Sequence, residues 1–206
     1  MPKIIDATAM RRRILTATWA VIATEGIQSV SMRRVARAAG STTGLITHYF
    51  ADKDELVTYA YRTVLDRMIA DATARVAQAG GVTERLLAAI EAIEPTTAEM
   101  QRFTIVLMNF WAQAAFNPAF AAHCRQDYRR WRRLIGGVIR DGIEAGELRA
   151  GTDARVLTDV LTLLSDGFSV GMTLTPFIYP RRHREAILTQ ILRPYLRDSA
   201  GSLAGT

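Results

Sequence analysis

The sequence is poor in the residues that build covalently or metal-stabilised folds. It contains one cysteine, Cys124, and three scattered histidines among 206 residues. A single thiol cannot form an internal disulfide, so a disulfide framework is excluded and a reducing cytoplasm is the expected location. The histidines and the cysteine lack the spacing of zinc ligands. We therefore expect no metal site and no cofactor.

Long apolar runs and catalytic motifs are also missing. No stretch reaches the ~18 consecutive apolar residues that a membrane span needs, so we expect no membrane partner. Residues 11–25 place basic residues before an apolar run, as a signal peptide does, but the apolar positions recur with helical periodicity. There is no G-x-S-x-G elbow and no phosphate-binding glycine loop. No catalytic residues are predicted, which weighs against an enzyme.

The sequence does contain a succession of helix signals. Nearly half of its residues are apolar and only six are proline, which indicates a globular chain. No segment shows the alternation of a half-buried strand. We predict an all-α fold of about nine helices. The expected ranges are 8–25, 31–39, 42–49, 52–79, 83–94, 96–116, 118–145, 153–175 and 181–197.

Positive charge is concentrated at the amino end. Residues 1–53 contain eight lysines and arginines against three acidic residues, a net charge of +5, whereas the whole chain carries +6. A basic segment on a nearly neutral body is the electrostatic footprint of nucleic-acid binding, and a merely basic, solvated surface is the alternative. We expect Arg11, Arg12 and Arg13 to reach DNA phosphates.

Residues 31–53 predict two short helices joined by a tight turn. Ser31 and Thr42 are good N-cap residues, and Gly40 stands where the first helix must end and the chain must turn. Leu45 and Ile46 can then point into the core, which leaves small polar residues on the outer side of the second helix. Such a helix can lie in the major groove and meet base edges and phosphates.

The same stretch resembles the tetracycline-repressor (TetR) family of bacterial regulators, and within it the branch of the betaine-pathway repressor BetI. The family pattern is kept at Gly40, Gly44, Tyr49, Phe50 and Lys53. It departs at Ser41, where valine is usual, and at Thr47, where tyrosine is common. The resemblance covers about a quarter of the chain. It implies a sequence-specific repressor that a small-molecule effector releases from a palindromic operator in double-stranded DNA.

The resemblance and the expected geometry assign a set of residues to the DNA interface: Ser31, Arg33, Thr42, Thr43, Gly44, Thr47, His48, Tyr49 and Lys53. Threonine can meet a base acceptor or a thymine methyl, but of these residues only Arg33 can recognise guanine with two hydrogen bonds. Tyr49 can instead be a core aromatic, and for Phe50 the core is the preferred interpretation. We place a DNA-binding domain at residues 1–53 and an effector-binding and dimerisation domain at residues 54–206.

A second group of residues is a candidate effector pocket, since pockets are mostly apolar with a few placed polar groups. Its members are Phe103, Leu107, Met108, Phe110, Trp111, Tyr128, Trp131, Asp166 and Phe168. Asn109 and Gln113 are further polar candidates, and a plain core is the alternative for residues 103–111. Asp166 lies in an apolar run, so it must anchor a ligand, cap a helix or bond across a dimer. A quaternary amine, the effector of choline-responsive relatives, would find cation–π faces on Trp111, Trp131 and Phe168.

The predicted helix at residues 153–175 carries apolar residues on more than one side, and the last predicted helix carries one apolar stripe. Leu157, Leu161 and Phe168 form one stripe, and Val156 and Leu163 add a second face. The resemblance implies that these helices pair with their copies as a four-helix bundle in a homodimer. Periodicity alone also allows an internal core.

The dimer would hold two reading helices ~34–36 Å apart, one turn of DNA, and we expect the helix at residues 52–79 to be the lever that changes their spacing. Two alternative functions stay open. One is a nucleoid-type protein that coats DNA without sequence preference, and the other, less favoured, is a helical enzyme that uses the central pocket.

Overall fold

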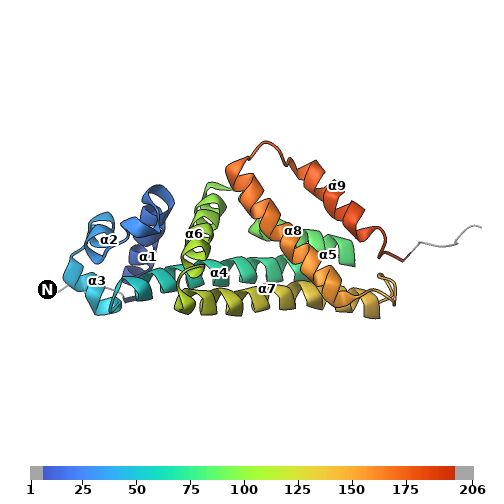
Figure 1. Cartoon of the computed structure of the whole chain (residues 1–206), viewed down its shortest axis with the longest axis horizontal. Helices are drawn as coiled ribbons and strands as arrows, with labels where there is room; N and C mark the ends of the chain where they lie inside the picture. The colour runs from blue at the N-terminus through green and yellow to red at the C-terminus, as the bar shows by residue number, and fades with distance from the viewer. Residues whose placement is uncertain (1–6, 198–206) are drawn as a thin grey trace, which may run out of the picture. The chain divides into compact units, whose positions relative to one another are not determined.

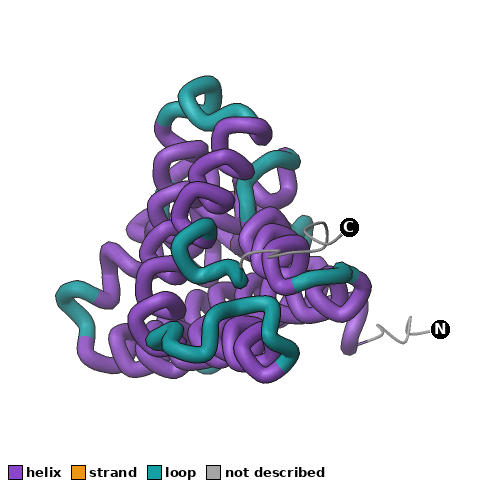
Figure 2. Tube along the Cα trace, turned by 90° about the vertical axis from the view of Figure 1, so that its right-hand side faces the viewer, coloured by secondary structure: helices purple, strands orange, loops and turns teal. Residues whose placement is uncertain are grey.

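The computed structural model describes residues 7–197, which fold almost entirely into helix (Figures 1 and 2). The elements in this range are α1 Ala7–Glu25, η1 Ile27–Ser29, α2 Met32–Ala38, α3 Thr43–Tyr49, α4 Lys53–Gln78, α5 Val82–Ile93, α6 Ala98–Ala114, α7 Pro118–Glu144, α8 Ala154–Leu174 and α9 Arg181–Leu192. An isolated bridge between Leu148 and Leu196 is the β pairing found in the same range. The prediction of an all-α fold is confirmed.

These helices form two compact units. The first comprises residues 7–67 and 95–125, so it holds α1 to α3, the first part of α4, α6 and the start of α7. The second comprises residues 68–94 and 126–197, with the rest of α4 and α7 together with α5, α8 and α9. The predicted boundary at residue 53 divides the chain by function, and it stays a prediction.

Side chains set the beginnings of several helices as the sequence predicts. Thr97 Oγ1 accepts from a backbone N–H of α6 at 3.2 Å, and Asp153 Oδ1 accepts from two in the first turn of α8. At α4, Asp52 Oδ1 accepts from Glu55 N–H at 2.8 Å, while the Glu55 carboxylate accepts from Ala51 N–H. These bonds satisfy backbone donors that a helix leaves unpaired at its start.

The last helix is shorter than the sequence analysis predicts, because α9 ends at Leu192 and not at residue 197. Pro194 explains the difference, since it has no N–H to continue the helix and its ring would clash with the preceding turn. The chain turns instead, and Arg149 N–H donates to Tyr195 O at 2.9 Å.

In the first unit, α1 packs on α2 and α6. Trp19 Nε1 of α1 donates to Ala60 O of α4 at 3.0 Å, and the Trp19 ring meets Phe103 of α6 edge-on with centroids 5.2 Å apart. Other rings of this core are stacked, with neighbouring centroids 3.7 and 4.6 Å apart, in the order Tyr61, Phe110 and Phe120. The helices α2 and α3 are therefore connected through α1 to a core of aromatic side chains.

In the second unit, a buried ion pair holds α9 to the end of α5. Arg184 Nε and Nη2 each donate to the Glu94 carboxylate at 2.6 Å, and the two residues are 6% and 2% exposed. Arg184 also donates to Tyr179 O. A charge so deeply buried is tolerated because it is paired and hydrogen-bonded.

Candidate functional site

The α2–α3 hairpin, residues 31–50, is built by local capping. Ser31 Oγ accepts from Arg34 N–H at 3.1 Å and Thr42 Oγ1 accepts from Leu45 N–H at 3.3 Å, so each helix starts on its predicted cap. Gly40 follows α2 with φ +56°, a left-handed conformation that glycine adopts without steric cost. The two caps and the glycine turn are confirmed.

A side chain from α1 braces this turn. Arg13 Nη2 donates to Gly40 O at 2.9 Å, and a Cβ at Gly40 would lie 2.7 Å from the same nitrogen. Sequence reasoning assigned Arg13 to phosphates and missed this bond, because it joins positions 27 residues apart and has no local signal. Arg13 ties the turn that precedes α3 to α1.

The outer side of α3 presents small polar residues to solvent. The exposed members are Thr42, Thr43, Gly44, Thr47 and His48. Ile46 is fully buried and Leu45 half-buried, as their predicted inward direction requires. A Cβ at Gly44 would meet nothing within 4 Å, so internal packing does not demand glycine there. The position leaves room for a surface that approaches α3 closely.

The aromatic pair at the end of α3 divides into one core residue and one at the surface. Phe50 is 4% exposed and packs beside Tyr59, with centroids 5.4 Å apart, so its core interpretation is confirmed. Tyr49 is half-buried, with its ring edge-on to His48 and the Arg11 guanidinium 5.8 Å from its centroid.

The cations of the hairpin differ in availability. Arg33 is exposed and has no hydrogen bond or ion pair within the described residues 7–197. Arg34 instead donates to the Glu25 carboxylate, and this hydrogen bond raises the pKa of Arg34 above its usual value. Lys53 is half-buried, with its Nζ 3.4 Å from Gln28 O. Arg33 is therefore available to an anionic partner, whereas Lys53 donates a hydrogen bond to the backbone of η1.

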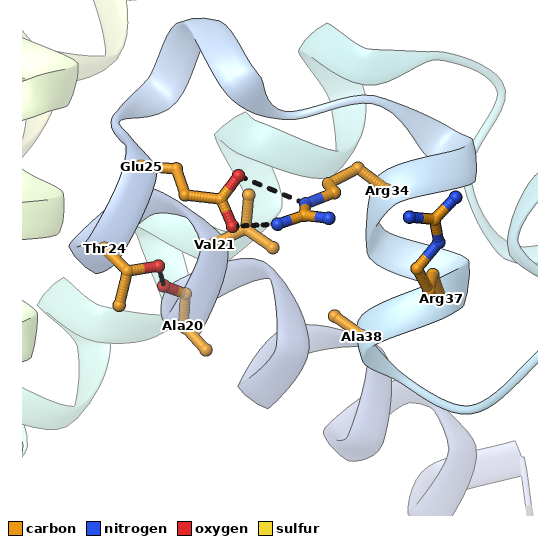
Figure 3. A pocket seen from close by; sticks show the side chains of 7 residues that line it. All are labelled: Ala20, Val21, Thr24, Glu25, Arg34, Arg37 and Ala38. Atoms are coloured by element: carbon orange, nitrogen blue, oxygen red, sulfur yellow. Dashed lines mark hydrogen bonds and ion pairs between the residues drawn. The ribbon is translucent and has the colours of Figure 1, made fainter.

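A pocket of about 210 Å³ lies between α1 and α2 (Figure 3). Its lining is Ala20, Val21, Thr24, Glu25, Arg34, Arg37 and Ala38. The carboxylate of Glu25 and the guanidinium of Arg34 point toward each other across it, with Nε 3.1 Å from Oε2 (Figure 3). Because these two charges satisfy each other, we attribute the pocket to the packing of α2 on α1.

The predicted effector residues on α6 lie in the first unit. Phe103, Leu107 and Phe110 are buried, and Met108 and Trp111 are half-buried. Phe110 is fully enclosed in the ring stack of this unit, so its first role is in the core.

The remaining predicted effector residues lie in the second unit, on α7 and α8. Tyr128 Oη donates to Asp166 Oδ2 at 2.9 Å, and Trp131 Nε1 donates to Ser165 Oγ at 3.1 Å. Phe168 is 4% exposed. The structure thus joins Tyr128 with Asp166 directly, and it gives Trp131 a hydroxyl partner that sequence reasoning did not name.

Burial alters the titration of the Tyr128–Asp166 pair. It raises the pKa of the Asp166 carboxyl above its usual value, while the hydrogen bond from Tyr128 acts in the opposite direction. Partial burial, followed by the hydrogen bond to Asp166 and the negative charge of Asp166, raises the pKa of Tyr128 to about 12. A carboxylate that is costly to ionise favours a partner with a positive charge or a proton to donate.

The two faces of α8 have different surroundings. Leu157, Leu161 and Phe168, the first predicted stripe, are buried. On the second face Val156 is 51% exposed and Leu163 66% exposed. An apolar helix face in water is typical of a surface that binds a partner.

The described residues 7–197 hold neither a group of metal ligands nor a helix suited to span a membrane. No three His, Cys, Asp or Glu side chains gather there as metal ligands would. No helix in this range combines the length and the apolar character that crossing a membrane requires.

Two family models match the sequence. The model of bacterial regulatory proteins of the tetR family matches residues 14–60, which include α2 and α3. The model of the C-terminal region of BetI-type transcriptional repressors matches residues 82–197, which include α5 to α9.

Full-length relatives agree with these matches. The transcriptional regulator PksA of Bacillus subtilis is 30% identical over 181 residues, 85% of this chain and 84% of its own. BetI of Cronobacter sakazakii is 28% identical over 204 residues, 97% of each chain. A transcriptional regulator of Rhodococcus sp. Rha1 has a TM-score of 0.77 at 27% identity, over 90% of this chain and 97% of that one. A protein of Saccharomonospora viridis, named as a transcriptional regulator and solved with choline, shares the fold, with a TM-score of 0.82 at 24% identity over 92% and 99%.

Proposed function

Because this chain belongs to the TetR family of DNA-binding transcriptional repressors, with a BetI-type C-terminal region, we propose that it binds a palindromic operator as a homodimer and is released by a small molecule. The observation that carries the proposal is the outward row of small polar residues on α3, behind a turn braced by Arg13. The DNA-binding domain is residues 1–53, since each proposed contact lies at or before Lys53, and residues 54–206 bind the effector and the second copy.

The proposed DNA contacts divide by chemistry. Ser31 and Thr42 already accept a backbone N–H, so each keeps its hydroxyl proton for a phosphate oxygen. Arg33 supplies recognition of guanine, and the α3 threonines supply contacts to thymine methyls or base acceptors. The other phosphate-facing groups are His48, Tyr49 and Lys53. Because one arginine carries the strong base contact, part of the sequence preference comes from DNA shape.

The homodimer is proposed to form through α8 and α9. Val156, Val160 and Leu163 recur at helical spacing on the exposed side of α8, and a Cβ at Gly167, on the next turn of that face, would meet nothing within 4 Å. A second copy of α8 would cover this face and approach closely at Gly167. The paired helices would form a four-helix bundle and set the two α3 helices ~34–36 Å apart.

Two groups of residues are proposed to contact an effector, each within its own unit: the α7–α8 group around Asp166 in the second unit, and the residues predicted on α6 in the first. A carboxylate beside a phenol and an indole suits a ligand that carries positive charge. The BetI-type C-terminal region makes quaternary amines the first ligands to test. Isothermal titration with choline and with betaine aldehyde at millimolar concentration should give saturable heat. An absence of heat removes this ligand class and leaves the repressor proposal standing.

The function is tested by selecting duplexes from fragmented genomic DNA and footprinting them. A discrete protected palindrome is the expected result, with affinity well above that for bulk competitor DNA. Uniform coating of every fragment would favour the nucleoid-type alternative. The enzyme alternative is set aside because the matched family consists of transcriptional regulators.

A further inference from the structure

The connection between α1 and α2 is held by a side chain from α6. Gly26 follows α1 and has φ +80°, a backbone conformation that glycine adopts easily, and the chain changes direction there before η1. The next backbone donor, Ile27 N–H, is bound by Asn109 Oδ1 at 3.1 Å across 82 residues. Asn109 Nδ2 donates to Ile105 O at 2.9 Å, which fixes the amide on its own helix. The Asn109 side chain thus joins α6 to Ile27, the residue that follows Gly26.

A second attachment joins α6 to the body of α1. The Trp19 ring meets Phe103 edge-on, and the Arg67 guanidinium of α4 lies 5.1 Å from the Trp19 centroid and 6.0 Å from the Phe103 centroid. Arg67 also reaches Glu99 of α6 at 3.8 Å. These contacts make α1 follow α6, whereas the α2–α3 hairpin lies beyond Gly26. Asn109 gives α6 a hydrogen bond on the hairpin side of Gly26, at η1.

We propose that Asn109 is the positioning residue that couples displacement of α6 to the orientation of the DNA-reading hairpin. Asn109 was expected among the polar pocket residues, and in the structure its amide oxygen accepts a hydrogen bond from Ile27 N–H. The lever expected at residues 52–79 stays a prediction. The proposal rests on the proposed function, because α6 also carries Phe103 to Trp111 of the proposed effector set. A ligand that shifts α6 moves this acceptor and thereby displaces Ile27, while the Arg13–Gly40 bond and the packing of α2 on α1 keep the hairpin attached.

Coupling of this kind is reciprocal. An operator that fixes the hairpin must favour one position of α6, just as the position of α6 biases the hairpin. Asn109 can therefore be tested from the DNA side, without knowledge of the effector.

Three variants of the full-length protein separate coupling from folding. Asn109→Leu removes the acceptor at similar volume, and Asn109→Asp keeps an oxygen for Ile27 N–H. Gln101→Ala removes an exposed amide from the same helix and serves as the matched control. If the leucine variant fails to fold by circular dichroism, Asn109→Ala replaces it, since alanine favours helix and adds no bulk.

The first measurement is hydrogen–deuterium exchange of the free protein, read on peptides that cover residues 26–50. Asn109→Leu should accelerate exchange there about tenfold, the scale expected for loss of one hydrogen bond worth about 1.4 kcal/mol. Gln101→Ala should stay close to wild type, and α8 peptides should be unchanged in every variant. Asn109→Asp keeps the acceptor for Ile27 N–H but loses the donor to Ile105 O, so its exchange should lie between that of wild type and that of Asn109→Leu. Wild-type exchange of the hairpin in Asn109→Leu would overturn the proposal.

The second measurement adds the duplex selected by footprinting. In the wild type, DNA should slow exchange in α6 peptides as well as in the hairpin. In Asn109→Leu the hairpin should still be protected while the protection of α6 is lost. Equal protection of α6 in both proteins would also overturn the proposal. If no duplex is selected, the proposed repressor function fails, and the free-protein experiment still decides whether Asn109 holds the hairpin.

Discussion

Arg33 is an exposed cation on α2, without a protein partner in the described chain, so it can give its whole charge to DNA. Arg33→Ala should weaken binding of the selected duplex about tenfold and lower the slope of log affinity against log salt by about one. Gel-shift titration at several salt concentrations measures both quantities. Arg102→Ala, which removes an exposed arginine from α6, should change neither. Wild-type affinity and slope in Arg33→Ala would remove Arg33 from the proposed DNA contacts.

Asp166 gives the stability of the second unit a pH dependence. Its folded-state pKa is raised by burial, so the folded state holds the proton more tightly than the unfolded chain does. Ionisation of Asp166 therefore lowers the free energy of unfolding above the ordinary Asp range, and protonation restores it as the pH falls. Asp166→Asn removes the charge and keeps an acceptor for Tyr128, so it should raise Tm at neutral pH by a few degrees. The difference should vanish below pH ~4.

Thermal unfolding between pH 4 and pH 8 tests this expectation, and Tyr128→Phe extends it. Tyr128 has its pKa raised to about 12, so its phenol stays protonated and donates to Asp166 throughout this range. Loss of that donor raises the pKa of Asp166 further. The pH dependence should therefore grow in Tyr128→Phe, and a pH-independent difference between Asp166→Asn and wild type would contradict the assignment.

The attachment of α9 to α5 depends on the buried pair of Arg184 and Glu94. Arg184→Ala leaves a buried carboxylate without its cation and Tyr179 O without its donor, so we expect a cost of about 3–5 kcal/mol in the free energy of unfolding. Replacing both charges, with Arg184→Met and Glu94→Leu, should cost much less. Urea unfolding measures the cost, with the exposed Arg182→Ala as control. A single variant as stable as wild type would show that the pair does not hold α9.

Helix starts could be predicted from the sequence because their causes are local. Ser31, Thr42 and Asp153 each bond a backbone N–H within three residues, and a reader of the sequence sees both partners in one window. The end of α9 has a local cause too, since Pro194 follows it, but the prediction followed the apolar stripe and extended the helix to residue 197. Local chemistry therefore accounts for the elements and for the exposed row on α3.

The bonds that fix these elements to one another could not be predicted. Arg13 reaches Gly40 across 27 residues and Arg184 reaches Glu94 across 90. Both arginines lie among other arginines with the same local context, so only the folded chain distinguishes the structural cation from its exposed neighbours. The same holds for the candidate site. Its exposed residues on α3 could be predicted from the sequence, but the Arg13–Gly40 hydrogen bond that holds the turn before α3 could not.

The proposed homodimer would affect how tightly the whole molecule holds DNA. In a homodimer the second head binds next to the first at a high effective concentration, which raises affinity by ~10²–10⁴ over a single head. A monomer has one α3 and reads half of a palindrome. The proposed interface on α8 therefore affects operator affinity without contacting DNA.

Leu163 tests this link because it is 66% exposed in the single chain, so a charge there disturbs a partner and not the fold. Leu163→Glu should sediment as a monomer at micromolar concentration and bind the selected palindrome ~100-fold or more weakly than wild type. Phe116→Glu is the matched control, since Phe116 is 91% exposed between α6 and α7, outside the proposed interface. It should stay dimeric and keep its affinity. A dimeric Leu163→Glu with wild-type affinity would show that the copies do not meet on this face of α8.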